Sequence, residues 1–163
     1  MMFPDKTLNF VTLLLDHARA QGFRIATAES CTGGLIAGAL TAIAGSSDVV
    51  DRGFIVYSNE AKTDLLGVPR ALIEAHGAVS DKVAIAMAEG AREKSRVALA
   101  VSCTGIAGPG GGTADKPVGL VHIAAAREGH TTHHLECRFG DIGRETIRLR
   151  SVEEALKLVL QIL

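Results

Sequence analysis

The stretch Thr27-Ala28-Glu29-Ser30-Cys31-Thr32-Gly33-Gly34 decides how the rest of this 163-residue chain is interpreted. A short strand-like run, Phe23-Arg24-Ile25-Ala26, precedes it, and a helical run, Leu35-Ile36-Ala37-Gly38-Ala39-Leu40, follows it. A strand that ends in small hydroxyl residues and glycines and then becomes a helix leaves several backbone N–H groups unpaired at one point. Those donors and the positive end of the helix dipole favour an anion, or an oxygen that becomes one. The Ser30 hydroxyl is therefore either a helix cap or a nucleophile.

Composition and length bound the class of protein. The length predicts a single domain, 1–163, and the alanine-, valine-, leucine- and glycine-rich composition without tryptophan suits a sheet closely covered by helices. A net charge of −1 with no basic stripe argues against a nucleic-acid partner. Three cysteines without CxxC spacing, no signal-peptide layout and no run long enough to span a bilayer predict a soluble, cytoplasmic protein.

Hydrophobic periodicity and turn residues predict strands that alternate with helices along the chain. The last two predicted strands are joined by a short connection, which makes them an antiparallel hairpin. The fold class that follows is a three-layer α/β/α sandwich with a mixed, largely parallel sheet. The predicted helices cover residues 5–20, 35–43, 58–66, 69–76, a segment from 80 and a terminal segment from 141 or 143. The predicted strands cover a segment from 23 to the Ser30 turn, then 52–57, 97–102, 117–126 and 131–139.

Three predicted strands end in residues suited to chemistry. They lead to Ser30, to Tyr57 with Lys62, and to Thr104 with a glycine-rich loop. In open α/β sheets the carboxyl ends of parallel strands form one rim, and ligands bind there. If these strands are parallel, the four side chains meet at a single crevice.

A serine hydroxyl beside a lysine amine and a phenol is a workable set for acyl transfer. Ser30 needs a base to remove its proton, and desolvation can lower the pKa of Lys62 far enough for it to be that base. Backbone N–H groups of a glycine-rich turn would then hold the oxyanion. Ordinary alternatives remain for the other two side chains: Tyr57 as a strand-end aromatic that packs its ring, and Lys62 as a solvated helix residue.

The loop from Thr104 to Thr113 has a composition suited to phosphate binding, although it matches neither a Walker A loop nor GxGxxG. A glycine-rich loop directly after a buried strand is more often functional than a flexible surface loop. Arg144 and Arg148, one helical turn apart, are suited to a phosphate or to a solvated helix face.

The cysteines and histidines also suggest a reactive thiol or a metal site, but their positions argue against both. Cys31 and Cys103 border candidate loops, but no histidine lies nearby in sequence to activate a thiol. His130, His133 and His134 suggest a metal, yet in a strand His130 and His134 face one way and His133 the other. Without a nearby cysteine or acidic cluster, an exposed hairpin edge is favoured over a zinc site, so no metal is expected.

Three motifs, in this order, resemble the C-terminal domain family of the competence/damage-inducible protein CinA. They are the opening stretch, residues 27–34, then Tyr57-Ser58-Asn59-Glu60-Ala61-Lys62, then Thr104-Gly105-Ile106-Ala107-Gly108-Pro109-Gly110-Gly111. The resemblance implies an α/β/α fold and nicotinamide mononucleotide amidohydrolase activity, which turns the carboxamide into the acid, releases ammonia and recycles pyridine nucleotides. It implies no metal or organic cofactor, and it would make this chain the stand-alone form of the domain.

The resemblance also implies roles for particular residues. The catalytic serine, tyrosine and lysine fall on Ser30, Tyr57 and Lys62. Near the terminal helix, similar proteins read Gly-Asp-Arg followed by Ile-Arg, so Arg148 fits and the displaced Arg144 departs from the pattern. The implied substrate-binding residues are Thr32, Gly33, Gly34, Thr104, Gly105, Gly108, Gly110 and Arg148.

Three hypotheses follow from this sequence. The favoured one is an amidase in which Ser30 attacks the carboxamide, Lys62 takes the proton and Tyr57 relays or positions it. The second is a non-catalytic module that binds a nucleotide or phosphate, and the third is a thiol-dependent hydrolase that uses Cys31. A small pyridine nucleotide is the expected ligand, and Ala- and Leu-rich helices make a homo-oligomer plausible.

Overall fold

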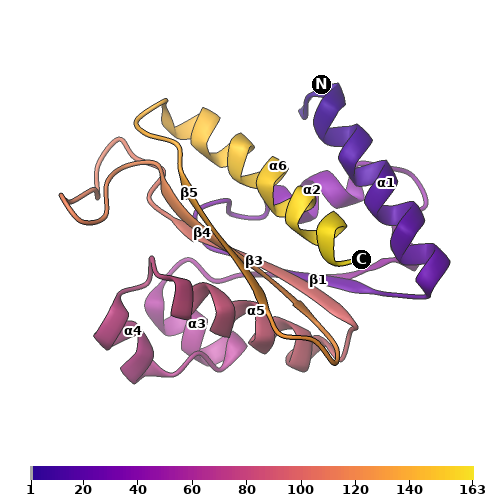
Figure 1. The fold of residues 1–163 in the computed structure, drawn as a ribbon, viewed down its shortest axis with the longest axis horizontal. Coiled ribbons are helices and arrows are strands. Elements are labelled where there is room, and N and C mark those ends of the chain that lie inside the picture. The colour runs from indigo at the N-terminus through magenta and orange to yellow at the C-terminus, as the bar shows by residue number, and fades with distance from the viewer. Residues whose placement is uncertain (1) are drawn as a thin grey trace.

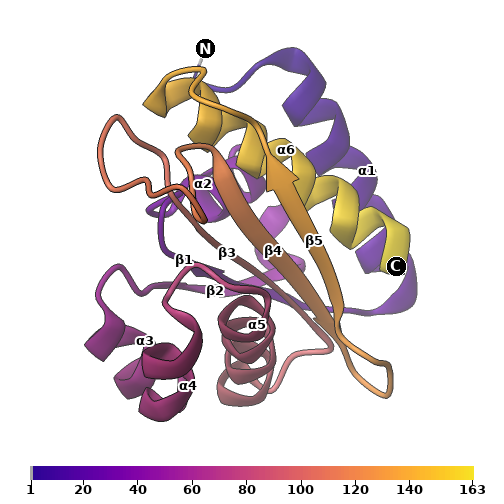
Figure 2. The ribbon, with the colours of Figure 1, turned by 60° about the vertical axis from the view of Figure 1, so that its left-hand side comes forward.

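The computed structural model describes residues 2–163 as three layers, a sheet with helices on both faces (Figure 1). Helices α1, α2 and α6 lie on one face, and α3, α4 and α5 lie on the other, as the turned view shows (Figure 2). The helices are α1 (Asp5–Gln21), α2 (Leu35–Thr41), α3 (Asn59–Leu66), α4 (Arg70–His76), α5 (Asp81–Ser95) and α6 (Arg144–Ile162), with a short 3-10 helix, η1, at Ser46–Asp48. The strands are β1 (Ile25–Glu29), β2 (Val50–Ile55), β3 (Leu99–Gly105), β4 (Leu120–Arg127) and β5 (His133–Arg138).

The sheet is mixed, and its strand order is β2-β1-β3-β4-β5. β1 is parallel to both β2 and β3, whereas β4 is antiparallel to both β3 and β5. Glu29, the last residue of β1, is in register with Ile55 and with Cys103. The predicted α/β/α class is therefore confirmed, and the three strands that precede the sequence motifs end at one edge of the sheet.

Small residues set how closely neighbouring elements approach. The central strands β1 and β3 are buried almost throughout, as strands covered on both faces are. Gly90 of α5 lies against the end of α3, and a Cβ atom built there would be 2.1 Å from the carbonyl oxygen of Leu66. Two apolar clusters fill the space on either side of the sheet. The pair α3–α5 is thus fixed against the strand ends.

Several element boundaries differ from those predicted. β1 begins at Ile25, two residues after the start of the strand-like run at Phe23, and ends at Glu29, directly before the Ser30 turn as predicted. β4 begins at Leu120 rather than at residue 117, since Gly119 adopts a φ of +92° and its N–H donates to the carbonyl of Ile106. α2 ends at Thr41, before the predicted end at residue 43.

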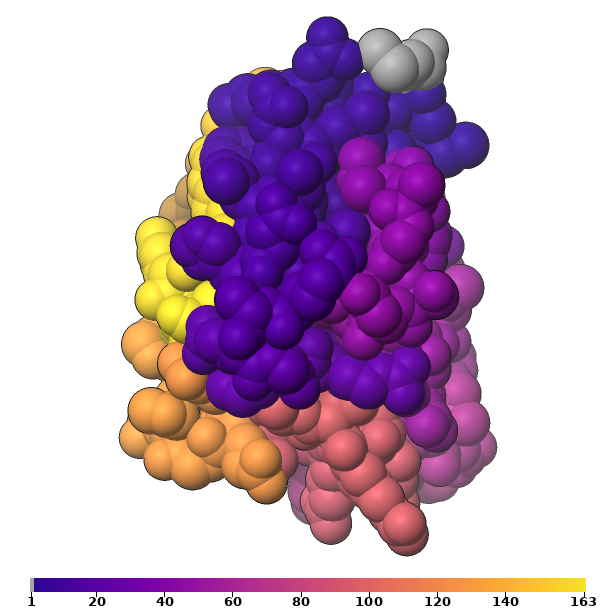
Figure 3. All heavy atoms as spheres, turned by 90° about the vertical axis from the view of Figure 1, so that its right-hand side faces the viewer, coloured from indigo at the N-terminus to yellow at the C-terminus, as the bar shows by residue number. Residues whose placement is uncertain are grey.

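The outer face of α1 covers one side of the molecule, next to the surface of α2 (Figure 3). The inner side of α1 buries Val11, Leu14 and Leu15. This is the amphipathic pattern that the spacing of its apolar residues predicts. No helix within residues 2–163 has the length and apolar character that crossing a membrane requires.

Candidate functional site

The structure brings Ser30 and Lys62 together at the carboxyl edge of the parallel strands. Ser30 follows β1 directly, and Lys62 lies on α3, which follows β2 after a short turn. The Nζ atom of Lys62 donates to the Oγ atom of Ser30 at 3.2 Å. α3 begins where it does because the hydroxyl of Ser58 accepts from the N–H of Ala61, a side-chain cap that fixes the first turn.

Lys62 has an unusual environment for a lysine. Its side chain is buried, with 1% of the residue exposed, and it forms no salt bridge within residues 2–163. Besides Ser30, its Nζ atom contacts the carbonyl oxygens of Val56 at 3.1 Å and Tyr57 at 3.3 Å. Burial lowers the pKa of Lys62, because removing the ammonium from water disfavours the charged form, and a charge at Cys31 opposes this in part.

The three contacts of Nζ fit either protonation state, since an ammonium can donate to all three oxygens. A neutral lysine amine has two N–H donors and one lone pair. When the carbonyls of Val56 and Tyr57 accept the two donors, the lone pair is left for the third contact, the Ser30 hydroxyl. In that state Lys62 is placed to receive the proton of Ser30.

A buried carboxylate holds the turn that follows Ser30. Glu29 is fully buried and accepts from the N–H groups of Ile36 at 2.8 Å and Ala37 at 3.0 Å, and from the Thr27 hydroxyl at 3.2 Å. The expectation that the start of α2 is open to an external anion is therefore wrong, because Glu29 already occupies it. Ser30 is also not the cap of α2, whose N-cap residue is Gly34.

The turn itself offers backbone donors at a different place. Gly33 and Gly34 have φ values of +58° and +100°, which residues with a side chain rarely adopt. Within residues 2–163, the N–H groups of Cys31 and Thr32 donate to no other residue. The hydroxyl of Thr32 is buried and has no hydrogen-bond partner. The donors nearest in sequence to Ser30 are therefore unpaired.

Arg148, expected among the substrate-binding residues, contacts the main chain of this turn. Its Nε atom donates to the carbonyl of Cys31 and its guanidinium to the carbonyl of Thr32, each at 3.1 Å. Gly33 lies so close that a Cβ atom there would be 3.3 Å from the Arg148 guanidinium. In this structure Arg148 supports the turn from the side of α6.

The glycine-rich loop is held at several points. Thr104 is buried, and its hydroxyl donates to the carbonyl of Ala78 at 2.9 Å. Gly105 and Gly108 are required by close packing, since a Cβ atom on either would come within 2.7 Å of a valine side chain. Arg144, the arginine that departs from the family pattern, donates to the carbonyl of Gly108 at 2.8 Å. Gly110 has open space around it.

Only the main chain of Tyr57 contacts the pair formed by Ser30 and Lys62. Its carbonyl oxygen accepts from Lys62, whereas its hydroxyl lies 3.4 Å from the guanidinium of Arg144. The residue is 64% exposed. The structure thus places the tyrosine next to the site but directs its phenol toward α6.

Cys31 and Cys103 are buried and contact each other. The Sγ atoms of Cys31 and Cys103 are 3.6 Å apart and belong to the apolar cluster under α1, α2 and α6. The contact lowers the pKa of Cys31 and raises that of Cys103, because one thiol donates to the other.

The histidines form no metal cluster. No group of three or more histidine, cysteine or acidic side chains suited to a metal lies within residues 2–163. His130 lies in the turn before β5 rather than in the strand, and His134 stacks on His122 of β4 with ring nitrogens 2.8 Å apart.

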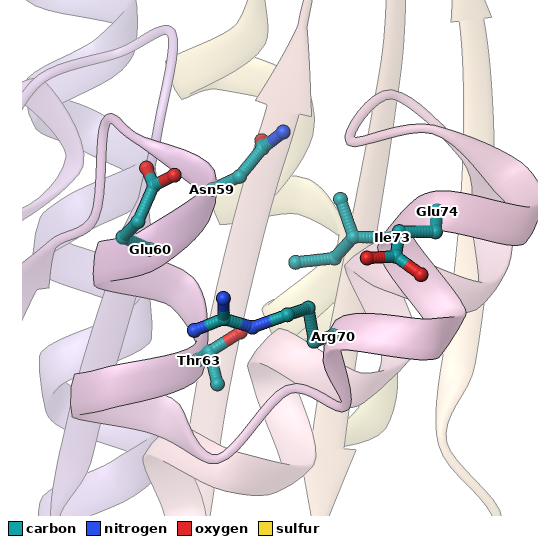
Figure 4. A pocket seen from close by; sticks show the side chains of 6 residues that line it. All are labelled: Asn59, Glu60, Thr63, Arg70, Ile73 and Glu74. Atoms are coloured by element: carbon teal, nitrogen blue, oxygen red, sulfur yellow. The ribbon is translucent and has the colours of Figure 1, made fainter.

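A separate surface pocket lies between α3 and α4 (Figure 4). It does not include Ser30 or Lys62, and it carries both acidic and basic side chains. The residues that line it are Asn59, Glu60, Thr63, Arg70, Ile73 and Glu74.

Comparison with known proteins identifies the family. Residues 8–163 match the family described as the CinA C-terminal domain, and the chain belongs to that family. It is 51% identical over 150 residues to a CinA-like protein of Syntrophobacter fumaroxidans, covering 91% of this chain and 34% of that protein. It is 52% identical over 141 residues to a putative competence-damage inducible protein of Caldicellulosiruptor bescii, covering 86% and 33%. The chain therefore spans about a third of the length of these relatives.

Solved structures agree with this assignment. A competence/damage-inducible protein from Agrobacterium tumefaciens is similar with a TM-score of 0.96 and 51% identity, covering 98% of this chain and 97% of that one. A CinA superfamily protein from Escherichia coli is similar with a TM-score of 0.92 and 34% identity, covering 96% and 90%.

Proposed function

We propose that this chain is an amidohydrolase that converts the carboxamide of nicotinamide mononucleotide to the carboxylic acid and releases ammonia. The substrate follows from the resemblance of its three motifs to the CinA C-terminal domain family. The observation that carries the chemistry is the buried contact of 3.2 Å between the amine of Lys62 and the hydroxyl of Ser30. Water is the second substrate, and the reaction uses no cofactor.

The proposed reaction begins with Ser30. Its Oγ atom attacks the carboxamide carbon while neutral Lys62 accepts the hydroxyl proton. The resulting ammonium of Lys62 then gives this proton to the amide nitrogen, and the C–N bond breaks to release ammonia. In the second half, Lys62 removes a proton from water as the water oxygen attacks the acyl carbon, the bond from that carbon to Ser30 Oγ breaks, and Lys62 returns the proton to Oγ. One base thus serves both halves of the reaction.

The oxyanion that forms on the carboxamide oxygen needs donors beside Ser30. The unpaired N–H groups of Cys31 and Thr32 are the proposed donors. Because Glu29 already neutralises the start of α2, this assignment relies on the turn amides rather than on the helix dipole. The rigid turn, held by Arg148 and Glu29, keeps those amides in place before the charge develops.

The rim of the site suits the phosphate of the substrate. Arg144 lies between Tyr57 and Gly108 and forms no salt bridge within the described residues 2–163. Its guanidinium therefore remains available to a phosphate, a group that arginine binds through paired hydrogen bonds.

Ammonia release from nicotinamide mononucleotide by the purified protein tests the proposal. We expect turnover by the unmodified chain and a loss of at least about 10³-fold in Ser30→Ala, since removing a nucleophile abolishes the covalent path. Calorimetry should show that Ser30→Ala still binds the mononucleotide. Binding without ammonia release by the unmodified chain would instead support a non-catalytic nucleotide-binding module.

Alkylation of the native protein with iodoacetamide distinguishes the thiol alternative. Cys31 is buried against Cys103, so we expect ammonia release to persist after treatment. Rapid loss of activity, together with an active Ser30→Ala variant, would assign the nucleophile to Cys31.

A further inference from the structure

Tyr57 presents an aromatic ring to solvent at the edge of the proposed site. It is the single tyrosine of the chain, in a sequence with 4% aromatic residues. It is 64% exposed, although the Lys62 amine that contacts its carbonyl is buried. An exposed tyrosine beside this buried pair offers a ligand an aromatic face and a polar hydroxyl.

Both ends of this residue are fixed. The carbonyl of Tyr57 accepts from Lys62 at 3.3 Å, and its hydroxyl lies 3.4 Å from Arg144. Arg144 in turn donates to Gly108 in the glycine-rich loop. The Tyr57 side chain therefore extends from the main chain beside Lys62 toward the start of α6.

The phenol is poorly placed for proton transfer. Among the hydrogen bonds of residues 2–163, the Tyr57 hydroxyl contacts Arg144 and neither Ser30 nor Lys62. Arginine stays protonated and cannot pass a proton onward at ordinary pH. Lys62 already contacts Ser30 directly, so the proton needs no intermediate carrier. The part of Tyr57 that is free to act is the face of its ring.

We propose that the ring of Tyr57 binds the cationic pyridinium of the substrate by stacking and cation–π attraction, an inference that rests on the proposed function. An aromatic face attracts a cation, and a flat cationic ring adds dispersion contact over the same area. No lysine or arginine of residues 2–163 covers the Tyr57 face, although Phe10, Phe23 and Phe139 each have such a partner. Tyr57 thereby selects a charged aromatic amide over a neutral one.

The test compares two ligands and two variants. Nicotinamide mononucleotide and its reduced form share the carboxamide, ribose and phosphate, but the reduced dihydropyridine ring is neutral and not aromatic. Tyr57→Phe keeps the ring and removes the hydroxyl, whereas Tyr57→Leu removes the ring and keeps an apolar side chain. Calorimetry in a Ser30→Ala background gives Kd, and ammonia release in the Ser30 protein gives KM and kcat.

We expect Tyr57→Leu to weaken binding of the oxidised mononucleotide roughly tenfold, the size of one strong cation–π contact. The reduced form should lose less than about threefold, since it gives no cation–π term. Tyr57→Phe should stay within about threefold of the parent in KM and in kcat, because it retains the ring face. Light scattering should show the same oligomeric state for all three proteins.

Other results would overturn the inference. If Tyr57→Phe and Tyr57→Leu lost kcat equally at unchanged Kd, the hydroxyl of Tyr57 and not its ring would act in the reaction. Equal weakening of both ligands would remove the role of ring charge, and a change of oligomeric state in Tyr57→Leu would make the residue a subunit contact. Because Kd is measured without turnover, a chain that releases no ammonia would refute the proposed function and still permit this test.

Discussion

Lys62 shows how one residue can combine poor solvation with a precise role. A buried lysine without a carboxylate partner is costly when charged, because no counter-ion replaces the lost water. Two carbonyls can accept from the two N–H groups of the neutral amine, so the neutral form leaves no buried donor without a partner. Burial therefore turns an ordinary lysine into a base with a lowered pKa.

The pH dependence of turnover follows from that shift. Only neutral Lys62 accepts the Ser30 proton, so kcat/KM should rise with pH and level off above the pKa of Lys62, which lies below its ordinary value of 10.5. Lys62→Arg should lower kcat roughly 10³-fold at every pH, because a guanidinium does not deprotonate. Initial rates from pH 6 to 10.5 measure both effects. A rising limb that survives in Lys62→Arg would assign the titration to another group.

The residue types in the sequence predicted the contact between Ser30 and Lys62 but not the role of Glu29 or the direction of the Tyr57 side chain. Ser30 and Lys62 were predicted to meet, and they lie in contact. The same reasoning did not identify the function of Glu29, although an acidic residue seven positions before Ile36, across a turn from a helix start, is a signal for capping. The direction of the Tyr57 side chain also depends on Arg144, whose position no local pattern gives.

At the scale of elements, the position of α3 determines the distance between Lys62 and Ser30. The hydroxyl of Ser58 caps its start, and Gly67 ends it with a φ of +70°. The C-terminal end of α3 packs on α5 at Gly90. The main chain of Leu66 is so close to Gly90 that a residue with a side chain does not fit there. The lysine is thus placed by helix packing rather than by its own short connection to β2.

Gly90→Ala tests this placement. The added methyl would lie 2.1 Å from the Leu66 carbonyl, so α3 must move away from α5 and carry Lys62 with it. We expect kcat to fall about tenfold or more, since small displacements of catalytic groups are costly. Overpacking of about 1–3 kcal/mol should outweigh the gain in helix propensity and lower Tm.

Gly38→Ala is the matched control for that change. It also places alanine inside a helix, but the nearest atom to its Cβ would be Phe3 Cζ at 3.6 Å, an ordinary contact. We expect unchanged kcat and equal or higher Tm in a thermal melt. Equal rates in both variants would show that α3 does not set the position of Lys62.

At the scale of the whole molecule, the site is assembled from both faces of the sheet. Lys62 approaches from the α3–α5 layer, and Arg148 approaches from α6, which lies in the opposite layer (Figure 2). The Ser30 turn lies between them at the edge of the parallel strands. Arg148, 117 positions after Cys31, therefore holds the main chain next to Ser30.

Arg148→Met separates support of the turn from contact with substrate. Without the guanidinium, the carbonyls of Cys31 and Thr32 lose their donor, and the amides beside Ser30 lose their fixed orientation. We expect kcat to fall about tenfold and unfolding free energy to drop by about 1–3 kcal/mol, the range for hydrogen bonds to a charged group. KM should change little.

Arg150→Met on the same helix is the control, because Arg150 lies over the ring of Phe139 and touches no part of the turn. Steady-state kinetics and thermal melts of both variants decide the matter. A large rise in KM with an unchanged kcat in Arg148→Met would instead show that Arg148 contacts the substrate.

The predicted homo-oligomer is a further property that the structure of one chain does not test. Light scattering of the purified protein measures it.

The sequence by itself determined the α/β/α class and the strands that carry the motifs, and it predicted that Ser30 and Lys62 meet if those strands are parallel. Those features depend on local periodicity, turn residues and the rule that parallel strands end at one edge. Only the tertiary structure decided that Glu29 occupies the start of α2, that Arg148 holds the turn and that the Tyr57 ring faces solvent. Each of these depends on side chains from separate layers meeting across the sheet, and sequence spacing carries no information about such long-range contacts.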